Sequence, residues 1–367
     1  MKVVNGNIID ENGKVIFFSK ENFSSYICKG NSCFICGDER ETKAFNDEHV
    51  IPRWILKKFK LFESSITLPN GRTFKYGKYK ISCCKDCNSL LGTSLEKIVS
   101  EGFDGDVKSS HAFFNENQDI IFQWICLLYI KTHLRDRSFI SDFKKKDKIS
   151  DQYEWVKLHH TYCIARRVYS GVTIDENVYG SMFFFECDTS NLSEPFDYID
   201  LYGTGSVLVK LRDFIIICII DDSKLVSRIV DEYLKKITGK LNDIQLRELF
   251  ARITEKNTRI MDKPKYVTSG NLQKRKVHIS AIVEREIRIA NYNKRYFGEM
   301  MYHLIQNHLY TPETEESKKT IRKLVRRIKK GEWTFLFDEK EVFIDNCDSP
   351  IDDEKEYLDL LRKNLNL

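Results

Sequence analysis

Two Cys-x-x-Cys pairs constrain the fold of this chain more than any other feature. The first pair is Cys33 and Cys36, and the second is Cys84 and Cys87. Two such pairs in one chain are typical of a structural zinc site with four thiolate ligands. Cys83 directly precedes Cys84 and is an alternative ligand to it. Four unrelated buried thiols are the other interpretation, and the paired spacing argues against it.

Side chains suited to metal-dependent chemistry lie between the cysteine pairs and just after them. Glu48 and His49 stand in the run DEHVIP, and Asn88 directly follows Cys87. Cleavage of a phosphodiester bond needs a base that deprotonates water and positive charge on the phosphate. Imidazole titrates near neutrality, and hard oxygen ligands suit Mg²⁺. Neighbouring side chains on a strand point to opposite faces, so Glu48 and His49 serve together only if the chain bends there.

The segment from Cys33 to about Glu96 resembles the HNH endonuclease family in its zinc-knuckle form. The resemblance rests on the runs CFICG, DEHVIPRW and CCKDCNSLLG, which occur in this order. It implies a ββα-metal fold, with two strands and a helix around one catalytic divalent ion. His49 would be the general base, and Glu48 and Asn88 would be ligands of Mg²⁺ or Mn²⁺.

Glu96 is a further candidate ligand of that ion. It lies about two turns beyond Asn88 on the helix expected after Cys87, so both side chains would share a face. A solvated helix charge is the alternative interpretation of Glu96.

The middle position of the motif departs from the family pattern. The family carries an asparagine a few residues before the second cysteine pair, where it braces the loop around the histidine. Tyr79 stands in that place, and Asn70 is the nearest asparagine upstream. Either Asn70 supplies the brace from the turn LPNGR, which is expected between two strands, or the brace is absent.

The insert between His49 and the second cysteine pair is basic. From Arg53 to Lys85 it carries nine Lys or Arg and one acid, with aromatic residues interleaved. This composition suits contact with a phosphate backbone, and a solvated hairpin is the alternative. The candidate nucleic-acid contacts are Arg53, Lys57, Lys58, Lys75 and Lys78.

A second basic run extends from Lys318 to Lys330. Apolar residues recur within it at helical spacing, which predicts an amphipathic helix with cationic outer faces. This helix is either a second nucleic-acid surface or a solvated face. The acids from Asp338 to Glu356 could offset it or pair with a neighbouring subunit.

Composition is that of a globular protein with room for two or three domains. The chain has 367 residues, 42% of them hydrophobic and 31% charged, with a net charge of +5. No apolar leader stands at the N-terminus, and no apolar run is long enough to span a membrane. The eleven cysteines are odd in number, so we expect a cytoplasmic protein with metal-bound and free thiols.

The predicted fold class is α+β, with an N-terminal ββα-metal zinc module followed by a larger mixed α/β domain. The module is expected at residues 1–100 and the mixed domain at 101–367. Within the latter, a long apolar helix is expected at Asp119–Asp136, strands over 153–220 and helices over 223–330. His159 and His160 fall in the strand pattern, so one side chain would face inwards and the other outwards.

The favoured function is that of a metal-dependent endonuclease acting on double-stranded DNA, with residues 101–367 as a specificity or control region. An HNH-like module joined to an unfamiliar domain is similar to the architecture of bacterial anti-phage defence effectors. A non-catalytic zinc-dependent module that binds nucleic acid or protein is the alternative. The residues leave RNA open as a substrate, and they leave open a second copy or a partner protein bound through the C-terminal region.

Overall fold

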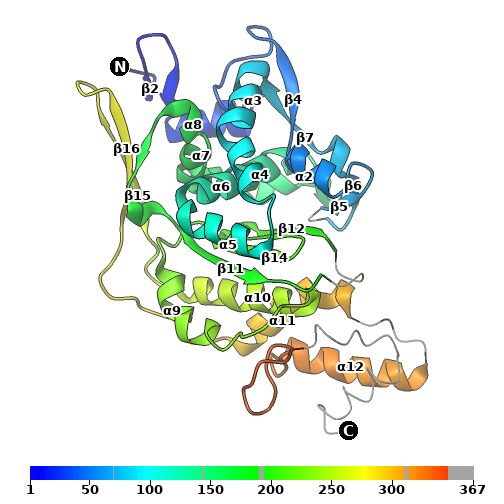
Figure 1. Cartoon of the computed structure of the whole chain (residues 1–367). Coiled ribbons are helices and arrows are strands. Elements are labelled where there is room, and N and C mark those ends of the chain that lie inside the picture. The colour runs from blue at the N-terminus through cyan, green and yellow to red at the C-terminus, as the bar shows by residue number, and fades with distance from the viewer. Residues whose placement is uncertain (69, 143, 190–193, 310, 312–313, 346–367) are drawn as a thin grey trace. The chain divides into compact units, whose positions relative to one another are not determined.

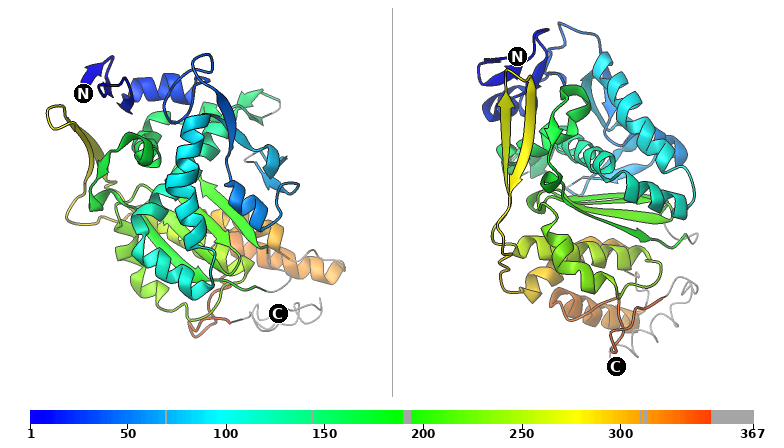
Figure 2. Two further views of the ribbon diagram at one scale, coloured as in Figure 1. Left: turned by 45° about the horizontal axis from the view of Figure 1, so that its top comes forward. Right: turned by 60° about the vertical axis from the view of Figure 1, so that its left-hand side comes forward.

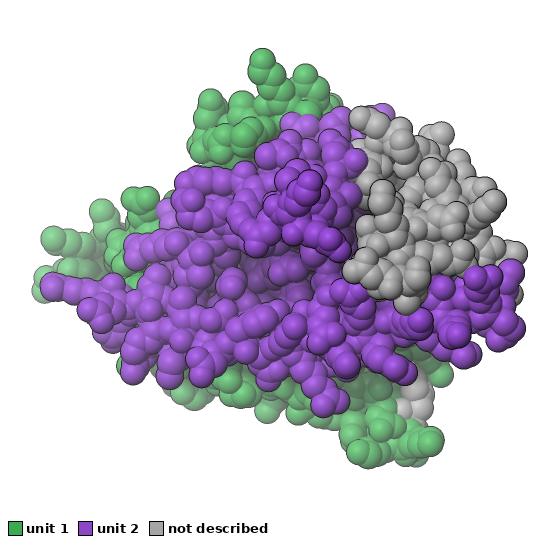
Figure 3. Space-filling view, turned by 90° about the horizontal axis from the view of Figure 1, so that it is seen from below, with its two compact units in different colours: residues 1–180, 264–283 green, residues 181–263, 284–367 purple. Residues whose placement is uncertain are grey.

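The computed structural model describes the chain apart from residues 69, 143, 190–193, 310, 312–313 and 346–367 (Figure 1). It is a mixed α+β fold, as the sequence predicts. The chain forms two compact units (Figure 3), and each is built from two separate segments. Unit 1 comprises residues 1–180 and 264–283, and unit 2 comprises residues 181–263 and 284–367. Residues 101–180 thus belong to the same compact unit as the cysteine pairs.

Strands β4 (Phe45–His49) and β7 (Lys80–Cys84) form an antiparallel pair at the centre of the predicted module. A helix follows β7 directly and consists of α3 (Lys85–Leu91), a π-helical segment (Gly92–Glu96) and α4 (Lys97–Gly102). Its first part, α3, packs against both strands (Figures 1 and 2). This is the strand–strand–helix order that the sequence predicts.

Helix α6 (Gln118–Asp136) is buried along almost its whole length in unit 1. It is confirmed where the apolar run predicts it, and side chains on all its faces are buried, as expected of a helix that is apolar all round. Further helices of unit 1 are α1 (Lys20–Asn22), α2 (Arg53–Lys58) and α5 (Val107–Glu116). The further strands are β1 (Lys2–Val4), β2 (Asn7–Ile9), β3 (Val15–Phe17), β5 (Ser65–Thr67), β6 (Thr73–Lys75), β8 (Ile140–Asp142), β9 (Asp147–Lys148) and β10 (Thr173–Ile174).

The strand prediction is wrong over the first part of residues 153–220. Helices α7 (His159–Ala165) and α8 (Arg167–Ser170) occupy this stretch. Leu158, Tyr162 and Ala165 are buried and recur at helical spacing, which outweighs the local strand propensity. Consequently, His159 and His160 are successive residues of one helix, and they do not face opposite sides of a strand.

The helical prediction over residues 223–330 is wrong in its middle. Strands β15 (Lys265–Asn271) and β16 (Lys276–Ile282) form an antiparallel hairpin there, and β16 also pairs in parallel with β10. The hairpin belongs to unit 1, whereas the helices before and after it belong to unit 2.

Unit 2 is a four-stranded antiparallel sheet with helices. The strand order is β11 (Ser181–Glu186), β14 (Phe214–Ile219), β13 (Ser206–Leu211) and β12 (Phe196–Leu201), and these strands lie where the sequence predicts them. The helices are α9 (Leu225–Leu234), α10 (Asp243–Arg259), α11 (Lys294–Ile305) and α12 (Glu315–Lys329). The acidic stretch beyond residue 345 lies outside the described residues. No helix in the described ranges is long and apolar enough to cross a membrane.

Candidate functional site

The four cysteines of the two pairs converge in unit 1. The Sγ atoms of Cys33, Cys36, Cys84 and Cys87 all lie within 4.8 Å of one another, and all four side chains are buried. The pKa of Cys33 lies well below its usual range, because the thiol of Cys36 and then those of its other cysteine neighbours donate hydrogen bonds to its sulfur. Four converging, buried sulfur atoms fit a structural metal ion such as Zn²⁺.

Local backbone geometry fixes the first cysteine pair. The amide of Gly37 donates to the carbonyl of Cys33 at 2.9 Å, and the amide of Cys33 donates to the carbonyl of Asp38 at 2.9 Å. Gly37 has a φ of +82°, and a Cβ at this position would lie 2.5 Å from the ring of Phe18. Only glycine therefore fits this turn.

The structure favours Cys84 over Cys83 as the third ligand. The Sγ atom of Cys83 lies 3.9 Å from that of Cys33, so Cys83 touches the edge of the cluster. The Sγ atom of Cys84 lies 3.8 Å from that of Cys36, and Cys84 belongs to the mutually close set whereas Cys83 does not.

A buried lysine that the sequence analysis did not single out lies beside the predicted catalytic residues. The Nζ atom of Lys131, on α6, donates to Glu48 Oε1 at 3.0 Å, to Glu96 Oε1 at 3.1 Å and to the carbonyl of His49 at 2.9 Å. An ammonium group has three N–H donors, and all three are used here. The side chain of Lys131 is completely buried, and those of Glu48 and Glu96 are 10% and 13% exposed.

When both carboxyl groups are ionised, this triad carries one net negative charge, because two carboxylates face one ammonium group. Burial raises the pKa of Glu96, although the charge of Lys131 opposes that change. Burial alone would lower the pKa of Lys131, but Glu96 and Glu48 outweigh it and the pKa is raised. Lys131 therefore stays an ammonium ion, and the triad can accept further positive charge.

His49 is the last residue of β4, and the chain bends directly after it at Val50. The bend follows both predicted residues: Glu48 and His49 pair in regular register with Ile81 and Lys80, so their side chains point to opposite faces of β4. The amide of Val50 donates to the carbonyl of Tyr79 at 2.9 Å, so the backbone at the predicted middle position holds the loop. Asn70 does not supply the brace: its Nδ2 donates to the carbonyl of Ile140, and its Oδ1 accepts from the amide of Arg72.

The imidazole of His49 is half-buried, and its ring packs edge-on against Phe62 with 6.0 Å between centroids. Burial lowers its pKa to about 4, and the positive charges of Lys80, Arg53 and Lys131 add to this effect. The imidazole is therefore neutral at pH 7, which is the form that can accept a proton.

Asn88 lies on the first turns of α3, next to β4. Its Nδ2 donates to Asn46 Oδ1 at 3.0 Å, so its own carbonyl oxygen is not used in this bond. Asn46 and Glu48 are two residues apart on β4 and therefore point to the same side of the strand. One turn after Asn88, a Cβ at Gly92 would meet no atom within 4 Å, so there is open space beside this part of the helix.

Among the described residues, one group of three or more His, Cys, Asp or Glu side chains has ligand atoms close enough to bind a single ion. This group consists of the four cysteines. Glu48, His49 and Glu96 do not form a second such group in that part of the chain. The contact that the structure gives to both carboxylates is Lys131. Their predicted role as ligands of a divalent ion stays a prediction.

Two of the five predicted phosphate contacts form ion pairs within the protein. Lys58 lies 3.2 Å from Asp104, and Lys75 pairs with Glu63. Arg53, Lys57 and Lys78 are exposed and form no ion pair with any residue that the structure describes. These three cations are the ones available to a phosphate backbone.

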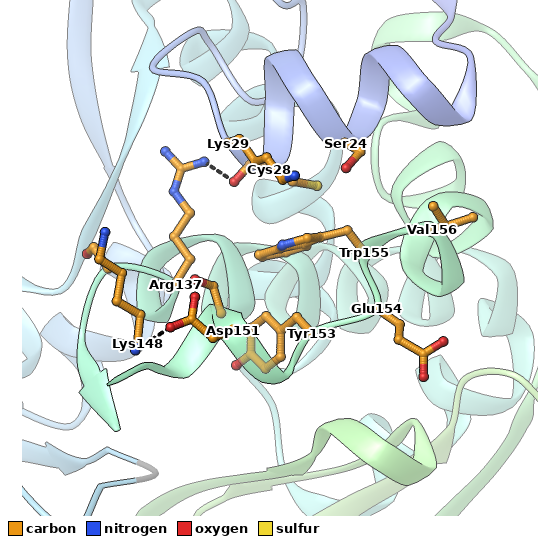
Figure 4. A pocket seen from close by; sticks show the side chains of 12 residues that line it. Ser24, Cys28, Lys29, Arg137, Lys148, Asp151, Tyr153, Glu154, Trp155 and Val156 are labelled. Carbon is orange, nitrogen blue, oxygen red and sulfur yellow. Dashed lines mark hydrogen bonds between the residues drawn. The ribbon is translucent and has the colours of Figure 1, made fainter. Parts of the chain in front are cut away.

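A pocket of about 730 Å³ in unit 1 is lined by none of the predicted site residues (Figure 4). Its polar groups stabilise the local backbone. The guanidinium of Arg137 donates to the carbonyls of Ile27, Cys28 and Gly30, and Asp151 accepts from the amide of Lys148 (Figure 4).

The cysteine cluster can be tested by comparing a variant of one proposed ligand with a control variant of the neighbouring Cys83. Cys36→Ser should yield protein without bound zinc and with unit 1 unfolded, because structural zinc sites contribute folding energy directly. Cys83→Ser should retain one zinc ion per chain, since Cys83 lies outside the mutually close set. Elemental analysis and thermal melting of both variants measure this. Loss of zinc in Cys83→Ser with retention in Cys36→Ser would reverse the assignment.

The buried triad leads to a stability prediction. Lys131→Met should lower the free energy of unfolding by about 3–5 kcal/mol, because it leaves two buried carboxylates without their cation. The control is Lys97→Ala, which removes a pair with Glu101 whose side chains are 66% and 68% exposed. That change should cost under about 1 kcal/mol. Equal losses in denaturant titrations of the two variants would contradict the prediction.

Comparison with known proteins does not identify the chain. No protein family model matches it, and neither does any curated protein or any solved structure. Its function is therefore argued from the geometry of unit 1.

Proposed function

We propose that the protein is a metal-dependent endonuclease of the HNH type that hydrolyses phosphodiester bonds of double-stranded DNA. One observation carries the proposal. The pair of β4 and β7, followed directly by α3, places His49 at the end of the first strand and Asn88 on the helix, with both cysteine pairs converging at the base. A zinc-stapled binding module has no need of the histidine and the asparagine in these positions.

His49 is proposed to take a proton from the attacking water. Its imidazole is neutral at pH 7, and it makes no hydrogen bond with any described residue, so both ring nitrogens are available. The carbonyl of His49 is held by Lys131, and the next amide is held by Tyr79. These two contacts fix the backbone on which the base stands. The nearby charges of Arg53 and Lys80 favour the approach of a phosphate.

Glu48 and Asn88 are the proposed ligands of the catalytic divalent ion, with Glu96 as a further candidate. Their donor atoms are carboxylate and amide oxygens, the ligands that Mg²⁺ prefers. When bound, such an ion supplies positive charge to the phosphate and the leaving oxygen. The presence of two carboxyl groups beside one ammonium group and the open space beside Gly92 are the observations that favour a cation here.

A non-catalytic zinc-dependent nucleic-acid-binding module is the second candidate. The observation in its favour is Lys131, whose ammonium group already pairs with Glu48 and Glu96. Exposed Arg53, Lys57 and Lys78 would serve binding equally well without cleavage. Catalysis is therefore the property that separates the two candidates.

Replacement of the base gives the decisive measurement. Wild-type protein should cleave plasmid DNA in the presence of Mg²⁺ or Mn²⁺, and His49→Ala should reduce the rate by about 10²–10⁴-fold, the usual effect of losing a general base. Zinc content and melting temperature should not change, because His49 is not a ligand of the cysteine cluster.

His303→Ala is the control, since this histidine is exposed on α11 in unit 2. It should cleave at the wild-type rate. Equal rates for wild type and His49→Ala would remove the catalytic role of His49. DNA binding without cleavage in the wild type, under both metals, would favour the binding module.

A further inference from the structure

Helix α12 is held in a fixed orientation on unit 2. Its buried side carries Ile321, Leu324 and Ile328, which share a hydrophobic core with Phe297 and Met301 of α11. Figure 1 shows α12 as a separate helix near the C-terminal end of the described chain. Because its apolar side is covered by the unit's own core, the opposite side of the helix faces solvent.

The solvent side of α12 is a continuous cationic face. Its members are exposed and are spaced three, four, seven and eleven residues from the first, so they form one stripe along the helix. The stripe is about 16 Å long at about 1.5 Å per residue. We call it the α12 cationic face, and it consists of Lys319, Arg322, Lys323, Arg326 and Lys330.

Three acids on or near this helix pair with cations outside the α12 cationic face. Glu315 lies 2.7 Å from Lys318, and Glu299 of α11 lies 3.6 Å from Lys329. Glu332 lies 3.8 Å from Lys294. No member of the α12 cationic face forms an ion pair with a residue in the described ranges. Among the residues that the structure describes, these five adjacent positive charges therefore have no acid paired with them.

We propose that the α12 cationic face binds the phosphate backbone of a nucleic acid. Phosphates follow one another about every 3.4 Å along each strand of a DNA duplex, so a 16 Å stripe can meet several of them at once. Lysine and arginine contacts of this kind add affinity and do not read the bases.

A lipid membrane fits this helix less well than a nucleic acid. An amphipathic helix binds a membrane by inserting its apolar side between the lipids. The apolar side of α12 is already packed in the core with Phe297 and Met301. The charged side chains of the α12 cationic face are the part of the helix that faces solvent. A polyanion with regularly spaced phosphates is complementary to them in charge and spacing.

The inference deepens the proposed function, because it adds a second contact with nucleic acid on unit 2. It does not depend on cleavage. The protein can therefore be tested in a His49→Ala background, in which the substrate stays intact.

The test compares two double variants of the full chain in that background. Lys319→Ala with Lys323→Ala removes two uncompensated charges, whereas Lys318→Ala with Lys329→Ala removes two that pair with Glu315 and Glu299. Both lower the net charge by two on the same helix. The probe is a short DNA duplex, and its affinity is measured over a range of salt concentrations.

The first variant should lower the slope of log affinity against log salt by about 1.8, since each phosphate contact contributes about 0.9. The slope of the second variant should equal that of the parent. Equal slopes in both variants would overturn the inference. Vesicles that contain anionic lipid are a second probe. If the first variant loses binding to these vesicles while its binding to DNA is unchanged, the inference is also overturned. If the two variants give the expected slopes but the wild-type protein does not cleave DNA, the proposed nuclease activity is contradicted and the inference about the α12 cationic face is not.

Discussion

The ammonium group of Lys131 is the contact that joins the parts of the candidate site. Its three hydrogen bonds reach the end of β4 at Glu48 and His49, and the π-helical segment after α3 at Glu96. A charge in a protein interior is tolerated only when it is paired and hydrogen-bonded. The end of β4 and the π-helical segment must therefore lie where Lys131 of α6 can reach both of them. The cysteine cluster fixes the other end of the same strand pair, at Cys84.

The segment with the HNH-like motifs shares buried polar contacts with residues beyond 100. Lys131 comes from α6, which lies beyond residue 100, and its contacts tie that helix to the strand that carries the predicted base. Another residue of the same helix, Asp136, accepts a hydrogen bond from Tyr79 at 2.6 Å. These two buried polar contacts explain in physical terms why residues 101–180 share a compact unit with the cysteine pairs.

What the sequence predicts well is what local spacing determines. The cysteine pairs, α6 and the strands of unit 2 follow from spacing or periodicity, and the strand–strand–helix order follows from the resemblance to the HNH family. The strand prediction over α7 was wrong, because a short buried helix has the same apolar content as a strand and only packing separates the two. Lys131 was missed because its three partners lie far away in sequence. Its signal was that Lys131 is the one Lys, Arg, Asp or Glu between Ile120 and Leu134 of this mostly apolar helix, and a charge in that place needs a buried partner.

Charges in this protein serve two different purposes, and burial separates them. Inside unit 1, Lys131 pairs with carboxylates and fixes the backbone at His49. Outside, Arg53, Lys57 and the α12 cationic face remain without an acid among the described residues. Exposed charges contribute little to folding stability, so stability does not account for five of them along one helix face. The proposed affinity for a polyanion would account for them, because each contact with a phosphate releases counterions and thereby strengthens binding.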